Sequence, residues 1–287
     1  MITDNQTNKV YLAQGLAKYH PLAEKLIQAL DSEGVNFSWL PRTESRKLIW
    51  ARDYMPIQLE KDLFLQYRYK PDYLKGYPQY IPNYKGICAD LGLNCFSTDI
   101  VLDGGNVIKC GTKVILTDKI FKENPHYERK ALVDTLEDLF RAELVLIPWD
   151  KYEMYGHADG MVRYIDNDRV LMNNYVNFDT NLRKRLLAVL TEHFEVLELD
   201  YAVARPSKMS WVFLNYLQVK DCIFVPWLPI WENKQAQMQL TAIFCNYKVN
   251  MYVPADDIAL EGGGLNCISW NILADEQARS QEEALLR

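Results

Sequence analysis

The sequence has few cysteines and histidines for its 287 residues. The six cysteines form no Cys-x-x-Cys pair, which argues against a disulfide-stapled scaffold and against a structural zinc site. Histidine is the side chain that changes charge near neutral pH without help from its surroundings. Only four side chains can therefore act as a base at neutral pH without a shifted pKa. They are His20, His126, His157 and His193.

Basic clusters and long apolar runs are also missing. Lys and Arg number 32 against 38 Asp and Glu, a net charge of −6, so we expect no nucleic-acid partner and favour a small cation. No apolar run approaches the roughly 18 residues that a membrane span requires, so no membrane partner is expected. The segment Met1–Gln6 lacks the basic and apolar regions of a signal peptide. A cytoplasmic location is the resulting expectation.

Short β-branched or aromatic segments recur along the chain, each after a stretch with helical apolar spacing. They begin at residues 35, 93, 144, 196 and 249, so successive segments lie 51 to 58 residues apart. Amphipathic helices are predicted over residues 21–30, 132–139, 182–190 and 235–244. A fixed period of about fifty residues is typical of radially arranged units that cannot bury a core alone. We predict one five-bladed α/β domain over residues 1–273, with 274–287 as a polar tail, helical or disordered.

One polar residue stands at a similar phase of each repeat, again 50 to 58 residues apart. These residues are Asp53, Asp103, His157, Asn215 and Cys267. An isolated Asp-Gly-Gly is usually only a turn, and a lone cysteine is usually a small buried hydrophobe. In a closed ring, however, residues at one phase converge on the axis. The shared phase therefore favours a functional site.

The converging residues include the groups needed for nucleophilic catalysis. Three glycines, Gly262–Gly264, precede Cys267, and such a turn can expose the thiol and bring backbone amides close to a ligand. A thiol needs an imidazole, for which His157 is the candidate, and a third group to orient it, for which Asp103 is available. On an extended segment, His157 and Asp159 would point to the same side.

Two carboxylates, Asp53 and Asp159, exceed what a cysteine protease triad requires. Beside a thiol they would raise its pKa, which opposes catalysis unless a cation neutralises them. A guanidinium carries a planar fork of donors that matches carboxylates, and it stays charged at neutral pH. Bound between the two carboxylates, it would favour the thiolate that attacks it. The residues therefore predict a site for a small cationic guanidino substrate.

Five motifs, in order along the chain, resemble those of a known family. They are Trp50-Ala51-Arg52-Asp53, Leu102-Asp103-Gly104-Gly105-Asn106, Gly156-His157-Ala158-Asp159, the Phe213-Leu214-Asn215-Tyr216 strand, and Gly262-Gly263-Gly264-Leu265-Asn266-Cys267-Ile268-Ser269. Between Trp50 and Ile272 the chain is similar to agmatine deiminases and bacterial, Porphyromonas-type, peptidylarginine deiminases, which belong to the guanidino-modifying penteins. The resemblance implies a pseudo-symmetric five-bladed α/β propeller of ββαβ repeats, and hydrolysis of a guanidine C–N bond.

The resemblance also implies roles for individual residues. Cys267 would be the nucleophile, His157 the general acid and base, and Asp103 the support of the histidine. The substrate-binding residues would be Asp53, Asp159, Asn215 and Trp50. The implied reaction uses no metal and no organic cofactor.

Three positions depart from the family pattern. Asp103 is one methylene shorter than the usual glutamate, Met55 replaces a common glycine, and Asn266 replaces the histidine that usually precedes the cysteine. Arg163 shares the parity of His157 and is a candidate partner for a carboxylate.

Agmatine, arginine, peptidyl arginine and other guanidines all remain open as substrates. Two alternative functions also remain open: an amidinotransferase with the same covalent intermediate, and a non-catalytic pentein binding protein. The sequence is compatible with a homo-oligomer.

Overall fold

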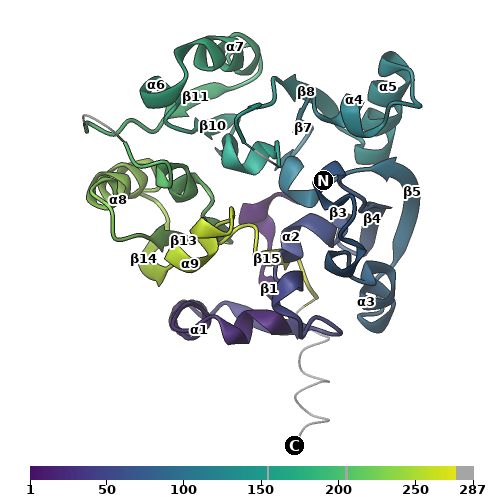
Figure 1. The fold of residues 1–287 in the computed structure, drawn as a ribbon, viewed down its shortest axis with the longest axis horizontal. Helices are drawn as coiled ribbons and strands as arrows, with labels where there is room; N and C mark the ends of the chain where they lie inside the picture. Colours follow the sequence, from purple (N-terminus) through teal and green to yellow (C-terminus); the bar gives the residue numbers. More distant parts are fainter. Residues whose placement is uncertain (154, 204–205, 276–287) are drawn as a thin grey trace, which may run out of the picture.

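The computed structural model describes residues 1–153, 155–203 and 206–275. Within them, five three-stranded sheets stand as blades around one axis (Figure 1). In every blade the inner strand is antiparallel to the middle strand, and the middle strand is parallel to the outer one. A helix precedes each outer strand and lies on the rim of the ring. The predicted propeller of ββαβ repeats is confirmed.

Four blades are continuous in sequence. The first has β3 (Ile57–Glu60), β4 (Leu63–Arg68), α3 (Tyr84–Asp90) and β5 (Cys95–Val101). The second has β6 (Ile108–Cys110), β7 (Lys113–Thr117), α4 (Ile120–Glu123), α5 (Arg129–Phe140) and β8 (Glu143–Ile147). The third has β9 (Val162–Asp166), β10 (Arg169–Met172), α6 (Tyr175–Phe178), α7 (Thr180–Leu190) and β11 (Glu195–Glu198). The fourth has β12 (Leu217–Val219), β13 (Cys222–Trp227), α8 (Glu232–Ile243) and β14 (Lys248–Pro254).

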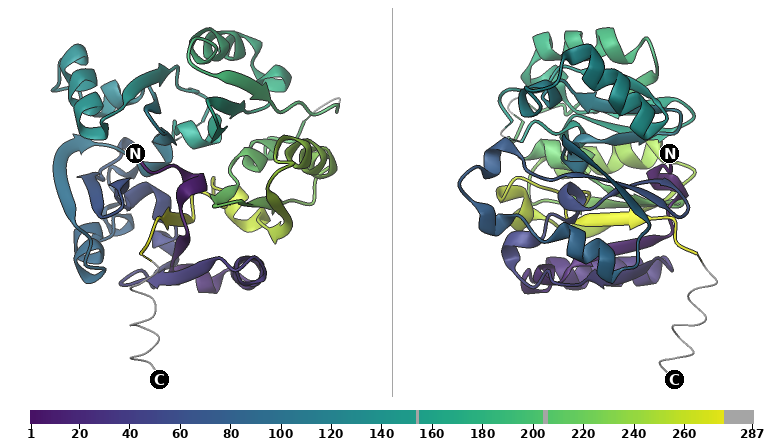
Figure 2. Two further views of the ribbon diagram at one scale, coloured as in Figure 1. Left: turned by 180° about the vertical axis from the view of Figure 1, so that it is seen from behind. Right: turned by 90° about the vertical axis from the view of Figure 1, so that its right-hand side faces the viewer.

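The fifth blade joins segments from opposite ends of the sequence. Its inner strand β15 (Ser269–Ile272) pairs antiparallel with β1 (Lys9–Ala13), with Leu12 opposite Ser269. The chain then forms α1 (Leu22–Ser32) and β2 (Asn36–Leu40), which runs parallel to β1. The two strands β1 and β15 therefore close the ring, and the side view shows the yellow C-terminal strand next to the purple N-terminal part of the chain (Figure 2).

The rim helices form where the apolar spacing predicts them. In α7, Leu182, Leu186 and Leu190 are buried, and the Asp179 side chain accepts hydrogen bonds from the first-turn amides of Asn181 and Leu182. This is an N-cap, which satisfies donors that the helix itself leaves unpaired. In α5, Leu132 and Leu136 are buried as predicted, but Phe140 rather than Leu139 completes the buried stripe.

Two local predictions are wrong. The Phe213–Tyr216 segment is not a strand, because Ser210–Leu214 forms a 3-10 helix and β12 begins only at Leu217. Ala158–Gly160 also forms a 3-10 helix, so His157 and Asp159 do not share an extended segment.

Two points concern the rest of the chain. Of the predicted tail, residues 276–287 lie outside the described residues. Among the residues that are described, no helix combines the length and the apolar character needed to cross a bilayer.

Candidate active site

The candidate site residues lie on the loops that lead into the five inner strands. They are Trp50 and Asp53 before β3, Asp103 before β6, His157 and Asp159 before β9, Asn215 before β12, and Cys267 before β15. Asp53 belongs to the one-turn helix α2 (Ala51–Tyr54), which lies near the ring axis (Figure 1). All seven are buried except Trp50, which is half-buried. Because the inner strands surround the axis, their leading loops meet at one end of it.

The His157 imidazole lies between two carboxylates. Its Nε2 is 2.7 Å from Asp103 Oδ2, and its Nδ1 is 3.7 Å from Asp53 Oδ1. Burial alone would lower the pKa of His157, but Asp53 and the hydrogen bond to Asp103 outweigh it and raise that pKa to about 10. The imidazole is therefore protonated at neutral pH, and both of its nitrogens are donors.

The Cys267 thiol faces the other carboxylate. Cys267 Sγ is 3.5 Å from Asp159 Oδ2, which also accepts a 2.7 Å hydrogen bond from Asn266 Nδ2. The backbone amide of Cys267 donates to Asn215 Oδ1 at 3.2 Å, so the asparagine helps to fix the position of the loop that carries Cys267. Burial, followed by Asp159 and Asp53, raises the pKa of the thiol well above its ordinary value. Without a cation in the site the thiol is neutral.

Asp53 has an oxygen that no described donor satisfies. Burial, reinforced by the nearby Asp103 and Asp159, raises the pKa of Asp53 to about 7, although His157 opposes the shift. Its Oδ1 is buried and has no hydrogen-bond partner among the described residues. A buried acceptor without a donor is costly, so this oxygen is suited to a donor that arrives with a ligand.

Glycines permit the close packing of the site. A Cβ on Gly105 would lie 2.6 Å from His157 Nδ1 and 2.8 Å from Asp53 Oδ1. A Cβ on Gly263 would lie 2.0 Å from Cζ3 of Trp50. The glycines of the Asp-Gly-Gly and Gly-Gly-Gly motifs therefore leave room for functional side chains.

Two cavities meet at the thiol and the imidazole. Their volumes are about 660 and 650 Å³, and they share Tyr155, His157, Gly262 and Cys267. One, here called the Asp159 lobe, is also lined by Asp159, Asp150, Glu153, Asn173, Asp179 and Trp211. The other, here called the Asp53 lobe, is also lined by Asp53, Trp50, Arg46, Lys47, Tyr69 and Tyr73. The thiol and the imidazole therefore lie between the two lobes. Carboxylates outnumber the single lysine, Lys208, in the Asp159 lobe, and the Asp53 lobe is aromatic and combines Arg46 and Lys47 with Asp53 and Glu261.

Sequence reasoning missed several residues at this site. Asn266, noted only as a departure from the family pattern, holds Asp159. Tyr73 and Tyr155 flank His157, each with its ring centroid 5.9 Å from the imidazole. With 18 tyrosines in the chain, nothing in the sequence singles these two out. Arg163 does meet a carboxylate, that of Asp4, rather than a residue of the two lobes.

Nothing in the described ranges indicates a metal centre. No group of three or more His, Cys, Asp or Glu side chains there is arranged to hold a metal ion.

The five ββαβ blades define an α/β propeller of the pentein class, and comparison with known proteins identifies the family. The model of the Porphyromonas-type peptidyl-arginine deiminase family matches residues 7–272. The chain belongs to this family, whose members are C–N hydrolases acting on guanidino groups.

Solved structures show the same fold at low sequence identity. An Enterococcus faecalis agmatine deiminase is 14% identical, with a TM-score of 0.74 over 93% of each chain. A cysteine-to-serine agmatine deiminase from C. jejuni with substrate bound is 14% identical, with a TM-score of 0.72 over 94% of this chain and 95% of its own. The substrate-bound N-terminal domain of a cyanobacterial arginine dihydrolase is 11% identical, with a TM-score of 0.64 over 93% and 98%. The chain has no significant match among the curated proteins.

Proposed function

We propose that this protein is a cysteine-dependent deiminase. It converts a guanidino substrate, agmatine or a related arginine derivative, into a ureido product and ammonia through a covalent thiouronium on Cys267. The observation that carries the proposal is the buried Asp53 Oδ1, which accepts no hydrogen bond from a described residue, on a side chain that lines a cavity together with Cys267 and His157. A guanidinium N–H group supplies the hydrogen bond that this oxygen lacks.

Binding places the guanidinium between Asp53 and Asp159, one from each lobe. Its positive charge removes the main electrostatic reason for the high pKa of Cys267, because both carboxylates contribute to that shift. The substrate therefore assists the ionisation of its own nucleophile. In the free protein the thiol stays neutral and is protected from adventitious reaction.

Chemistry then follows in two steps. The Cys267 thiolate adds to the central guanidinium carbon, a C–N bond breaks, and His157 donates a proton to the departing ammonia. The thiouronium that remains is attacked by water, from which His157 takes a proton. The C–S bond breaks, which releases the ureido product and regenerates the thiol. Asp103 supports His157 in both steps through its 2.7 Å contact.

The lobes offer different surroundings to the rest of the substrate. An ammonium such as that of agmatine suits the Asp159 lobe, where Asp150, Glu153 and Asp179 contribute carboxylates. The carboxylate of an arginine derivative suits the part of the Asp53 lobe that Arg46 and Lys47 line, away from the lobe's own carboxylates, Asp53 and Glu261. The similarity to agmatine deiminases supports agmatine, and the membership of the peptidyl-arginine deiminase family supports peptidyl arginine.

The proposal is tested with a panel of agmatine, arginine and a peptide with a C-terminal arginine, assayed for ureido product and ammonia. We expect turnover of at least one compound by the unaltered protein and none by Cys267→Ser or Cys267→Ala, while Cys267→Ser still binds that compound. Full activity in either variant would overturn the assignment of the nucleophile.

Two alternative functions give different results in the same assay. An amidinotransferase expels the alkylamine rather than ammonia and passes the amidino group to an acceptor amine, so it releases no ammonia with or without that amine. A non-catalytic binding protein binds a guanidine but turns over nothing in the panel.

A further inference from the structure

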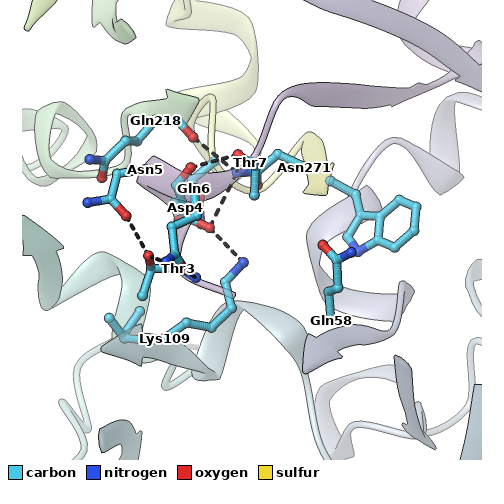
Figure 3. Close-up of polar contacts among 12 residues, drawn as sticks. Thr3, Asp4, Asn5, Gln6, Thr7, Gln58, Lys109, Gln218 and Asn271 are labelled. Carbon is cyan, nitrogen blue, oxygen red and sulfur yellow. Dashed lines mark hydrogen bonds and ion pairs between the residues drawn. The ribbon is translucent and has the colours of Figure 1, made fainter. Parts of the chain in front are cut away.

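A second ring of polar residues lies within the five inner strands. It is displaced along the ring axis from the candidate site residues, which lie on the loops before these strands. It comprises Gln58 in β3, Lys109 in β6, Arg163 in β9, Gln218 in β12 and Asn271 in β15. Successive members are 51 to 55 residues apart, and all are buried. The ring axis therefore carries two polar layers, of which the second has no part in the proposed chemistry. Figure 3 shows four of its members around the N-terminal segment.

The N-terminal segment fills this second ring. Asp4–Gln6 forms a 3-10 helix, and the residues around it form hydrogen bonds with β3 and with the residue after β12. Ile2 N donates to Gln58 O at 3.4 Å, and Lys220 N, just beyond β12, donates to Thr7 O at 3.1 Å. The candidate site residues precede the inner strands, so the N-terminal segment closes the axis from the opposite end.

The Asp4 carboxylate contacts three blades and helix α2 at once. Its oxygens lie 2.7 Å from Lys109 Nζ, 3.1 Å from Arg163 Nη2 and 3.9 Å from Arg52 Nη1, and they accept a 3.3 Å hydrogen bond from Asn271 Nδ2 (Figure 3 draws the Lys109 and Asn271 contacts). Burial would raise the pKa of Asp4, but the three cations hold it well below its ordinary value. Asp4 is therefore ionised at neutral pH.

Three buried cations depend on this one carboxylate. The side chains of Arg52, Lys109 and Arg163 are at most 6% exposed, and that of Asp4 is 17% exposed. Within the described residues, no other carboxylate lies within 4 Å of any of the three. A buried charge without a partner is strongly destabilising, so Asp4 fixes where the three cations can stay.

Two of the cations contact the loops of the candidate site. Arg52, next to Asp53 in α2, donates from its backbone amide to Cys267 O at 3.1 Å and from Nε to Asn266 O at 3.4 Å. Arg163 donates from Nη1 to Tyr216 O at 2.8 Å, and Tyr216 follows the residue that holds the Cys267 amide. A shift of either guanidinium therefore displaces the segments that carry the nucleophile and its carboxylates.

We propose that Asp4 is a positioning residue for the deiminase reaction. By holding Arg52, Lys109 and Arg163 at the axis, it keeps the blades in the register that brings Cys267 and Asp53 to their reactive positions. The inference rests on the proposed function, in which Cys267 is the nucleophile.

The test compares three variants of the full-length protein. Asp4→Asn removes the charge. Asp4→Glu keeps the charge but moves the carboxylate by one methylene, so it remains informative if Asp4→Asn does not fold. Asp168→Asn is the matched control, because Asp168 is exposed and, within the described ranges, its carboxylate pairs with Lys113 alone. Each variant is assayed for kcat and KM with agmatine or the best substrate of the panel, well below its unfolding temperature. Alkylation of Cys267 by iodoacetamide, followed by peptide mass spectrometry, gives a second measurement that needs no guanidine.

A positioning role predicts a specific pattern. Since a displacement of about 1 Å can cost on the order of 100-fold in rate, folded Asp4→Asn should lose about tenfold or more in kcat, with a smaller change in KM. Asp4→Glu should fall between it and the unaltered protein, and the alkylation rate of Cys267 should change in the same order. Asp168→Asn should match the unaltered protein.

Folded Asp4 variants that lose thermal stability but keep kcat and the alkylation rate would show a structural role only. If the unaltered protein turns over no guanidine, the proposed function fails, and the alkylation rates still report on Asp4.

Discussion

Cys267 Sγ lies 3.5 Å from Asp159 Oδ2, and both residues are buried. A carboxylate this close to a nucleophilic thiol works against ionisation, and Asp159 is second only to burial in raising the pKa of Cys267. Ionisation of the thiol beside this carboxylate is unfavourable in the free protein and becomes favourable once a bound cation contacts both groups. The site is thus arranged for a charged substrate rather than for a generally reactive thiol.

Replacement of Asp159 should separate thiol reactivity from turnover. In Asp159→Asn the pKa of Cys267 should fall, so iodoacetamide should alkylate Cys267 faster near neutral pH. Ureido formation should drop by ~100-fold or more, since losing one partner of a buried charge pair costs several kcal/mol. Asp168→Asn, an exposed Asp→Asn change, serves as the control. Slower alkylation in Asp159→Asn would contradict this explanation of the thiol.

Substrate affinity should depend on pH through Asp53. Its carboxyl group has a pKa of about 7 in the free protein, whereas guanidinium binding requires the carboxylate. Below pH 7 the affinity of Cys267→Ser for agmatine should therefore weaken by up to ~tenfold per pH unit, as measured by calorimetry. His157, with a pKa of about 10, stays protonated over this range and adds no slope. An affinity that does not vary between mildly acidic and neutral pH would rule out this role for Asp53.

Asp103 should set the pH range over which His157 can act as an acid. Asp103→Asn removes a charged acceptor 2.7 Å from Nε2, so the pKa of His157 should fall below its present value of about 10. The alkaline limb of the kcat profile should then move to lower pH. Asp103→Glu keeps the charge and should keep the limb. The same alkaline limb in Asp103→Asn and in the unaltered protein would contradict the assignment.

The space beside Gly105 should be essential for activity. A methyl group there would lie 2.6 Å from His157 Nδ1 and 2.8 Å from Asp53 Oδ1, so Gly105→Ala should separate the two side chains. We expect a loss of kcat/KM of about 100-fold, because positioning errors near 1 Å cost that much.

A glycine far from the site provides the control for Gly105→Ala. Gly34 has a φ of +66° and nothing within 4 Å of the position of a Cβ. Gly34→Ala should therefore lower the melting temperature through backbone strain and leave kcat/KM unchanged. Equal kcat/KM values for Gly105→Ala and Gly34→Ala would show that the close packing at Gly105 is not needed.

The fold and the ring of candidate residues could be predicted because each blade repeats the same local pattern. The apolar spacing of α7 and its Asp179 cap are local signals. Asp53, Asp103 and Cys267 share a phase because each precedes an inner strand. A period that a chain repeats five times is visible without any knowledge of tertiary contacts.

Other features depend on contacts between distant parts of the chain. The pairing of β1 with β15 and the contacts of Asp4 with three cations join residues that no local pattern relates. The extended segment predicted at His157 is wrong because a 3-10 turn intervenes before β9. Asn266 is important through its side-chain contact with Asp159, and its residue type alone gives no sign of that contact.

The central claim is that Cys267 forms a thiouronium after ammonia has left. The most direct test is rapid acid quenching during turnover of the best substrate, followed by mass spectrometry of the peptide that contains Cys267. We predict an adduct with the mass of the guanidine minus ammonia, which forms and decays at rates compatible with kcat. Ureido product formed at full rate with no adduct on Cys267, or an adduct carrying only the amidino group, would contradict the proposed deiminase mechanism.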